Sequence, residues 1–109
     1  MAYDKGLVEL IHGDLADSGP LREVRMFGGL CLMLNGNMLC GVHPGGAMYR
    51  VGKNNAAAAL ALPGVREMDF TGRPMAGFVD VSDEAMADDD IRAELTRLAL
   101  DYVGNLPAK

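Results

Sequence analysis

An Asn-Gly pair at Asn35 and Gly36, flanked by two apolar runs, is the feature that most constrains the fold. Asn and Gly both accept positive φ, and a two-residue turn of that kind matches the right-handed twist of a β-hairpin. The pair therefore predicts one strand over residues 30–34 and a second over residues 38–43. It fixes the strand pairing, and the pairing in turn places the side chains of the hairpin on defined faces.

The two cysteines of the chain lie in this hairpin. Counting outward from the turn places Cys31 opposite Cys40 in a non-hydrogen-bonded pair, where Cα atoms are about 4.5 Å apart. A disulfide tolerates that distance at the short end of its range, so a redox pair is one hypothesis. No basic residue is adjacent in sequence to lower either thiol pKa. Structural thiols that pack like small apolar side chains are the preferred interpretation.

Both faces of the predicted hairpin are apolar. Strict alternation places Cys31, Met33, Met38 and Cys40 on one face and Leu32, Leu34 and Leu39 on the other. Both faces then need cover. Helices of the same domain are the preferred cover. A Met-bearing face against a partner chain is the alternative, because Met side chains suit adaptable binding surfaces, and a homodimer is one form of it.

Periodicity along the rest of the chain predicts an α+β domain that comprises residues 1–109. Short connections favour an antiparallel meander sheet of about five to six strands, with an N-terminal helix, a short middle helix and a C-terminal helix. Helices are expected over residues 3–16 and 56–62 and after the acidic run at residues 88–90. Strands are expected over residues 23–27, 30–34, 38–43, 47–51, 65–70 and 76–81.

Polar residues before the expected helices predict their N-termini. Asn54 or Asn55 is expected to cap the middle helix, since an amide oxygen accepts the free N–H groups of a first turn. Ser82 precedes two acidic residues, and the acidic run at residues 88–90 precedes the last helix. Carboxylates are favourable at this end of a helix, which is electropositive.

Charge and hydropathy exclude several classes of function. The net charge is −5, which disfavours direct nucleic-acid binding, because such binding depends on neutralising phosphates. No apolar stretch reaches the ~20 residues that a transmembrane helix needs. The N-terminus lacks the basic and apolar regions of a signal peptide. The sequence therefore predicts a cytoplasmic protein that does not enter the membrane, and its thiols should stay reduced.

Sequence motifs for catalysis, metals and cofactors are absent. Gly28 and Gly29 match neither a phosphate-binding loop nor a dinucleotide fingerprint, so they are interpreted as conformational glycines at a strand bend. His12 and His43 have no spacing typical of metal ligands. No nucleophile, base and orienting group can be assembled. Neither a catalytic residue nor a metal nor a cofactor is predicted, and whether the protein is an enzyme stays open.

Three arginines lie in or beside the predicted strands, at Arg25, Arg50 and Arg73. Guanidinium groups suit carboxylate and phosphate, so these side chains could converge on an anion or a partner. Pairing with the domain's own Asp and Glu residues is the alternative.

Several segments together resemble the N-terminal domain of the TfoX/Sxy family. They are Arg25-Met26-Phe27-Gly28-Gly29, the Asn35-Gly36 hairpin, Arg50-Val51-Gly52, Phe70-Thr71-Gly72-Arg73-Pro74-Met75-x-Gly77 and Leu106-Pro107-x-Lys109. The resemblance covers nearly the whole chain. It implies an α+β domain with an antiparallel sheet and helices, and a non-enzymatic protein-binding role. The namesakes of the family are regulators of natural competence, thought to act as protein coactivators with the cyclic-AMP receptor protein. Those regulators carry a C-terminal domain that this sequence lacks, so a stand-alone N-terminal domain is expected.

The resemblance and the charge distribution together suggest where a partner binds. The binding residues predicted are Arg25, Phe27, Gly28, Gly29, Arg50 and Arg73. A small cytoplasmic regulatory module that binds a protein is the first hypothesis. An anion-binding or small-molecule-binding domain, with or without catalysis, is the second, and a thiol redox switch through Cys31 and Cys40 is the third.

Overall fold

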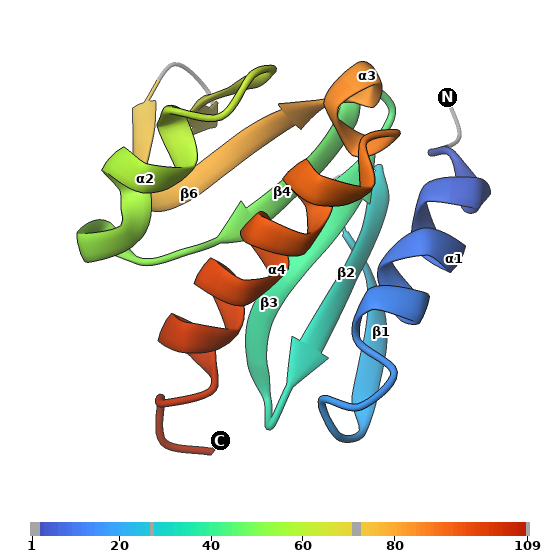
Figure 1. The fold of residues 1–109 in the computed structure, drawn as a ribbon. Coiled ribbons are helices and arrows are strands. Elements are labelled where there is room, and N and C mark those ends of the chain that lie inside the picture. The colour runs from blue at the N-terminus through green and yellow to red at the C-terminus, as the bar shows by residue number, and fades with distance from the viewer. Residues whose placement is uncertain (1–2, 27, 71–72, 109) are drawn as a thin grey trace.

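The predicted α+β architecture is confirmed by a computed structural model, which describes residues 3–26, 28–70 and 73–108 (Figure 1). The N-terminal, middle and C-terminal helices form where they were predicted, a further short helix follows Ser82, and the strands match the predicted ones to within a few residues. In chain order the elements are α1 (Lys5–Asp14), β1 (Leu21–Met26), β2 (Gly29–Leu34), β3 (Asn37–His43), β4 (Gly46–Arg50), the 3-10 turn η1 (Lys53–Asn55), α2 (Ala56–Leu60), β5 (Val65–Phe70), β6 (Arg73–Ser82), α3 (Asp83–Met86) and α4 (Asp89–Val103).

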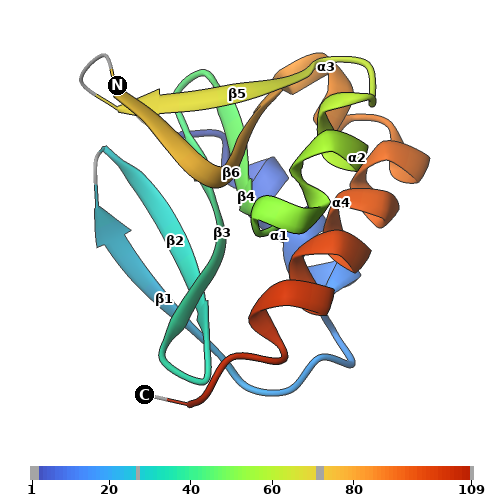
Figure 2. The same ribbon diagram turned by 90° about the vertical axis from the view of Figure 1, so that its left-hand side faces the viewer.

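The six strands form one antiparallel sheet in the order β1-β2-β3-β4-β6-β5. The first four strands follow one another as a meander, because tight turns join them. After β4 the chain leaves the sheet through η1 and α2 and returns as a hairpin, whose second strand, β6, pairs with β4. The sheet bends so that its outer strands, β1 and β5, extend away from the helices (Figure 2).

The Asn35-Gly36 turn forms as predicted, with φ of 53° and 82°, and Met33 lies opposite Met38. One step farther from the turn the register shifts, and Leu32 pairs with Cys40, so Leu39 is an extra residue in β3. A bulge of this kind lets two successive residues of one strand face the same core.

The prediction that Cys31 lies opposite Cys40 is therefore wrong. Cys31 pairs with Gly41 instead, and Cys40 shares a face with Leu32. Cys40 belongs to the hydrophobic core, whereas Cys31 lies on the other face of the sheet. A disulfide would require one side chain to cross the sheet, which removes the geometric basis of the redox hypothesis.

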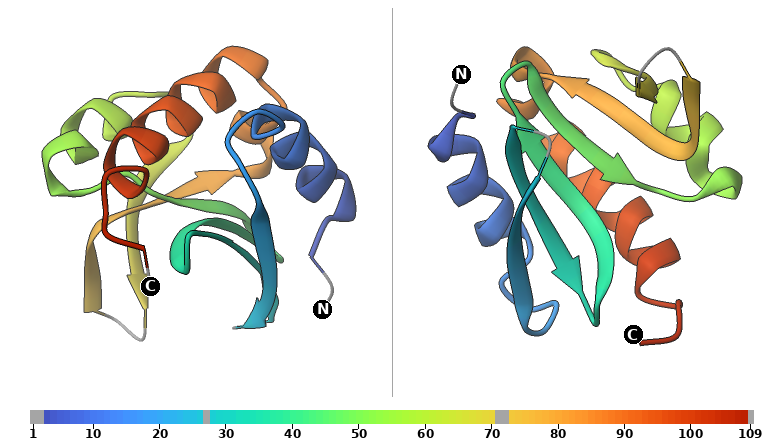
Figure 3. Two further views of the ribbon diagram at one scale, coloured as in Figure 1. Left: turned by 90° about the horizontal axis from the view of Figure 1, so that it is seen from below. Right: turned by 180° about the vertical axis from the view of Figure 1, so that it is seen from behind.

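All helices of the described chain cover one face of the sheet, as the view from below shows (Figure 3, left). The expectation that helices cover both faces is wrong, and the sheet presents a concave face that carries no helix. The core lies between the sheet and the helices. Its most deeply buried large side chains are Ile11, Leu39, Tyr49, Met86 and Leu95.

Helix caps form at two of the expected places, Ser82 and the acidic run at residues 88–90, and at Asp4, which was not predicted. The Asp4 carboxylate accepts a hydrogen bond from the Gly6 N–H at 2.8 Å, and the Ser82 hydroxyl accepts one from Ala85. The Asp88 carboxylate accepts two, from the first turn of α4. In the described part of the chain, no helix is long and apolar enough to span a bilayer.

Candidate functional site

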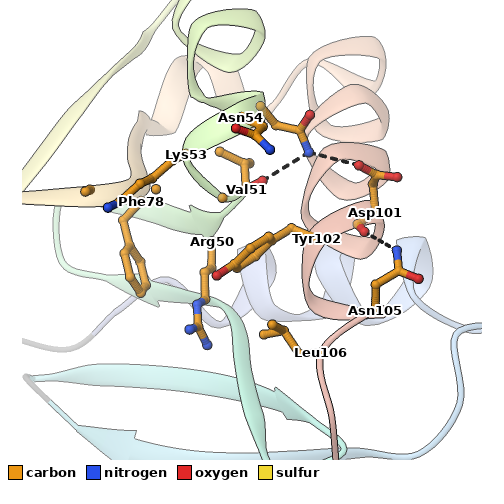
Figure 4. A pocket seen from close by; sticks show the side chains of 13 residues that line it. Arg50, Val51, Lys53, Asn54, Phe78, Asp101, Tyr102, Asn105 and Leu106 are labelled. Atoms are coloured by element: carbon orange, nitrogen blue, oxygen red, sulfur yellow. Dashed lines mark hydrogen bonds between the residues drawn. The ribbon is translucent and has the colours of Figure 1, made fainter.

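A pocket of about 700 Å³ lies where β4 ends, beside the last turn of α4 and the middle of β6 (Figure 4). Its lining comes from three parts of the chain that are distant in sequence. They are residues 50–55, residues 76–78, and the C-terminal residues Asp101, Tyr102, Asn105 and Leu106. The size is in the range of sites that bind small molecules or side chains.

Arg50 is the central side chain of the pocket. Its guanidinium carbon lies 5.7 Å from the ring centre of Phe78 and 5.5 Å from that of Tyr102. Both distances are within the range of cation–π attraction, so the rings hold the guanidinium in a fixed orientation. No carboxylate of the described residues forms a salt bridge with Arg50. Its N–H donors are therefore available to a group that enters the pocket.

Two glycines allow the walls of the pocket to approach one another. Gly52 has φ of 86°, and a Cβ atom there would lie 2.5 Å from the Tyr102 ring. Gly77 has φ of 84°, and its carbonyl accepts hydrogen bonds from the N–H groups of Val51 and Gly52 at 2.9 and 3.0 Å. A Cβ atom at Gly77 would lie 3.3 Å from the backbone of Gly52, so the two segments approach closely. Glycine at Gly52 lets Tyr102 reach Arg50.

Asn55 joins the pocket loop to α4 rather than capping α2. The α2 N-cap has no side-chain hydrogen bond, so the cap predicted at Asn54 or Asn55 is wrong. The Asn55 amide instead donates to the carbonyls of Val51 and Leu98 and to the Asp101 carboxylate, at 3.1 to 3.3 Å. These three acceptors, one from the loop and two from α4, fix the orientation of the side chain and tie the loop to α4.

Cations exceed carboxylates in the pocket. Arg50 and Lys53 line it together with one carboxylate, that of Asp101, which already accepts a hydrogen bond from Asn55. Asparagine side chains add further donors. Such a site attracts an anion, and the fork of a guanidinium suits a carboxylate in particular. The lining contains no His, Cys, Ser or Thr.

The structure does not bring the predicted arginines together. Arg25 is exposed on the outer strand β1 and pairs with Leu30, with β2 and β3 between it and the strand that carries Arg50. Arg73 begins β6 at the end remote from α3, and its side chain lies outside the described part, as does Phe27. Only Arg50 of this set lines the described pocket.

Gly28 and Gly29 have conformational roles, as predicted. Gly28 has φ of 74°. A Cβ atom at Gly29 would lie 1.9 Å from the carbonyl oxygen of Val42, because β2 and β3 approach closely there. Binding by these two glycines stays a prediction.

Neither thiol is activated. Cys31 and Cys40 are both free and buried. Burial raises the pKa of the Cys31 thiol, and burial also raises the pKa of Cys40, with smaller contributions from Cys31 and Asp14. Neutral thiols are poor nucleophiles. In the described residues, no three His, Cys, Asp or Glu side chains are placed to hold a metal ion.

Sequence reasoning missed two of the three side chains at the centre of the site. Tyr102 follows Leu98 at the four-residue spacing of an apolar helix stripe, which predicts core packing, and Phe78 carries no signal of its own. The Gly52 that follows Arg50 and Val51 was the available signal, because it marks a close approach.

Comparison with protein families identifies the TfoX N-terminal domain, whose model matches residues 14–103. Comparison with curated proteins and with solved structures gives no match.

Proposed function

The chain belongs to the TfoX N-terminal domain family, and on that basis we propose that it is a non-enzymatic regulatory module that binds a protein partner in the cytoplasm. In this proposal the pocket around Arg50 receives a carboxylate from an acidic side chain of the partner.

The proposal depends on one observation, the surroundings of the Arg50 guanidinium. Two aromatic rings orient its guanidinium, yet no described carboxylate forms a salt bridge with it. A charge held in this way has lost side-chain freedom before any ligand arrives, so binding loses less entropy. A carboxylate can accept two parallel hydrogen bonds from the fork, and Lys53 adds attraction at the same wall.

The chemistry of the lining favours binding over catalysis. General acid–base work needs a group whose pKa lies near the operating pH, and nucleophilic work needs an activated hydroxyl or thiol. Asp101 is already hydrogen-bonded to Asn55, and the other polar groups are amides, cations and the Tyr102 phenol.

Substitution of Arg50 tests the proposal directly. The variants R50A and R50K are compared with the wild type in affinity capture from native cells, followed by titration of the captured partner. We expect R50A to lose the partner and R50K to weaken it about tenfold, a cost of about 1.4 kcal/mol. Lysine keeps the charge but not the planar fork. The control is R97A, because Arg97 is exposed on α4 and pairs with Glu94.

Capture that is equal for R50A and the wild type, with both folded by circular dichroism, would contradict the proposal.

The volume of the pocket favours a second candidate, a small organic carboxylate as ligand. Saturable binding of free glutamate or glutarate at micromolar concentration, without any captured protein, would favour that candidate instead.

A further inference from the structure

The segment that follows α4 forms one side of the Arg50 pocket. This tail segment comprises residues 104–107, and two of them, Asn105 and Leu106, line the pocket. Leu106 is half-buried and also packs against the hydrophobic core. In the view of Figure 4 the Arg50 side chain lies between Phe78 and Leu106. One wall of the pocket therefore depends on a segment that belongs to neither the sheet nor a helix.

Hydrogen bonds hold the tail segment at both of its ends. The N–H groups of Gly104 and Leu106 donate to carbonyls of the last turn of α4, at 2.9 and 3.1 Å. At the far end the Pro107 carbonyl accepts a hydrogen bond from the side-chain amide of Asn37 at 3.0 Å. Pro107 also has a fixed φ and disfavours helical backbone angles at Leu106 before it. The backbone on both sides of Leu106 is thus restrained.

Strand register explains why Asn37 reaches the tail segment. Asn37 begins β3 and pairs with Leu34, and directly paired residues point to the same side of a sheet. Leu34 belongs to the core under the helices, so Asn37 points to the side on which the tail passes the tip of the hairpin (Figures 1 and 2). Asn37 is only 3% exposed. Because a buried amide is unfavourable unless it is hydrogen-bonded, its contact with Pro107 is a specific link between segments 70 residues apart.

The surroundings of the Arg50 guanidinium are largely apolar. The rings of Phe78 and Tyr102 lie against it, and Leu106 lines the same pocket. Such side chains exclude water from a carboxylate bound at Arg50, and an ion pair is stronger where water is excluded. They also gain from contact with apolar groups of a ligand and oppose the burial of unpaired polar ones. A carboxylate with apolar neighbours therefore fits this pocket better than one with polar neighbours.

We propose that Leu106 selects the segment of the partner that binds at Arg50, favouring an acidic side chain flanked by apolar ones, and that Asn37 positions Leu106 for this role. The inference rests on the proposed function, since it names the kind of segment that the same pocket takes. Arg50 binds the carboxylate, and Leu106 provides apolar contact beside it. Asn37 acts through the Pro107 carbonyl and is a positioning residue.

Peptide titration of the intact protein, followed by NMR of labelled leucine methyl groups, tests the proposal. The probe is a capped pentapeptide with a central Glu and a Leu two residues to each side, because alternate side chains of an extended segment share a face. One matched peptide has Ser in place of both Leu residues, and another has Gln in place of Glu. We expect the wild type to bind the Leu peptide at least about tenfold more tightly than the Ser peptide, as burial of an apolar side chain predicts. The methyl signals of Leu106 should shift on binding.

Variants separate selection by Leu106 from attraction by charge. L106A and N37A should reduce the preference for the Leu peptide to about threefold or less, with little change for the Ser peptide. N37D should behave like N37A, because a carboxylate keeps the shape of the amide but has no N–H to donate to Pro107. N35G is the matched control and should keep the full preference, since Asn35 is exposed in the same turn and Gly accepts its positive φ. Leu106 is only half-buried, so L106A keeps the test decisive even where a change at Asn37 lowers the melting temperature.

Failure of this inference is distinguishable from failure of the proposed function. Equal binding of the Leu and Ser peptides to the wild type, with both lost in R50A, would overturn selection by Leu106 and leave the Arg50 site standing. Full preference in folded L106A would overturn it in the same way, and full preference in folded N37A and N37D would overturn the positioning role of Asn37. Equal binding of the Glu and Gln peptides, or no binding of the Leu peptide at millimolar concentration, would contradict carboxylate recognition at Arg50 and with it both proposals.

Discussion

The helical side of the molecule and the concave side with its adjoining pocket contain the same residue types, but these residues have different surroundings. Arg92, Cys40 and Met86 lie on the helical side, where every one of them is buried. Arg92 donates to the Asp14 carboxylate at 2.8 Å and to the Met86 carbonyl at 3.0 Å, and its charge also contacts Asp89. Arg50, by contrast, is oriented by aromatic rings and has no carboxylate partner among the described residues.

The difference shows what an ion pair can and cannot indicate about function. The Arg92 side chain is 6% exposed, so its charge would be unfavourable without its partners. The hydrogen bond from Arg92 to Asp14 is also the main reason that the pKa of Arg92 is raised. An arginine whose three guanidinium nitrogens each have an acceptor, such as Arg92, holds α1 against α4. An arginine with donors available, such as Arg50, can recognise a ligand.

The largest effect is expected for R92A. Removing one partner of a buried pair leaves the Asp14 carboxylate without its counter-charge and should lower the free energy of unfolding by about 3–5 kcal/mol. Urea denaturation followed by circular dichroism measures it. The matched control is R97A, whose exposed pair with Glu94 should contribute little. A loss no greater than that of R97A would show that the two arginines do not differ in this way.

The next largest effect is the difference in free energy of unfolding between two methionine variants. Met86 is fully buried between sheet and helices, so M86A should lower the free energy of unfolding by about 2–5 kcal/mol. Met48 packs on the concave face, and M48A should cost less because no helix closes over the space that is left. The same denaturation experiment measures both. Equal losses would mean that the concave side is packed as tightly as the core.

The smallest effect concerns the thiols. Burial raises the pKa of both cysteines, so the folded chain holds protons that the unfolded chain releases near its ordinary thiol pKa of about 8.5. Unfolding therefore releases protons above that pH, and the contribution of the thiols makes the protein less stable as the pH rises. Iodoacetamide labelling with mass spectrometry checks the order of reaction at pH 8.5. Cys31 should react before Cys40, and the reverse order would contradict the assignment of the two faces.

Local sequence signals predicted the elements of this fold because they act over a few residues. Asn35 and Gly36 take positive φ, and Ser82 and Asp88 accept hydrogen bonds from the helices that follow them. Asn55 is a case in which a local signal predicted the wrong contact. Its type is right for a cap, but in the folded chain its amide nitrogen donates to carbonyls of Val51 and of Leu98 in α4.

The Asn35-Gly36 hairpin also has features that local sequence determined and others that tertiary packing determined. Its turn, its two strands and the pairing next to the turn were determined by the sequence itself, since Asn-Gly geometry is intrinsic to those two residues. The bulge at Leu39 was decided by tertiary packing, because the helices provide one core in which Leu39 and Cys40 are both buried. That single extra residue separated the two cysteines. Likewise, the sequence supplied Arg50, but only the folded chain brought Phe78 and Tyr102 to it from β6 and α4, because contacts between distant segments form only when the core that joins them is buried.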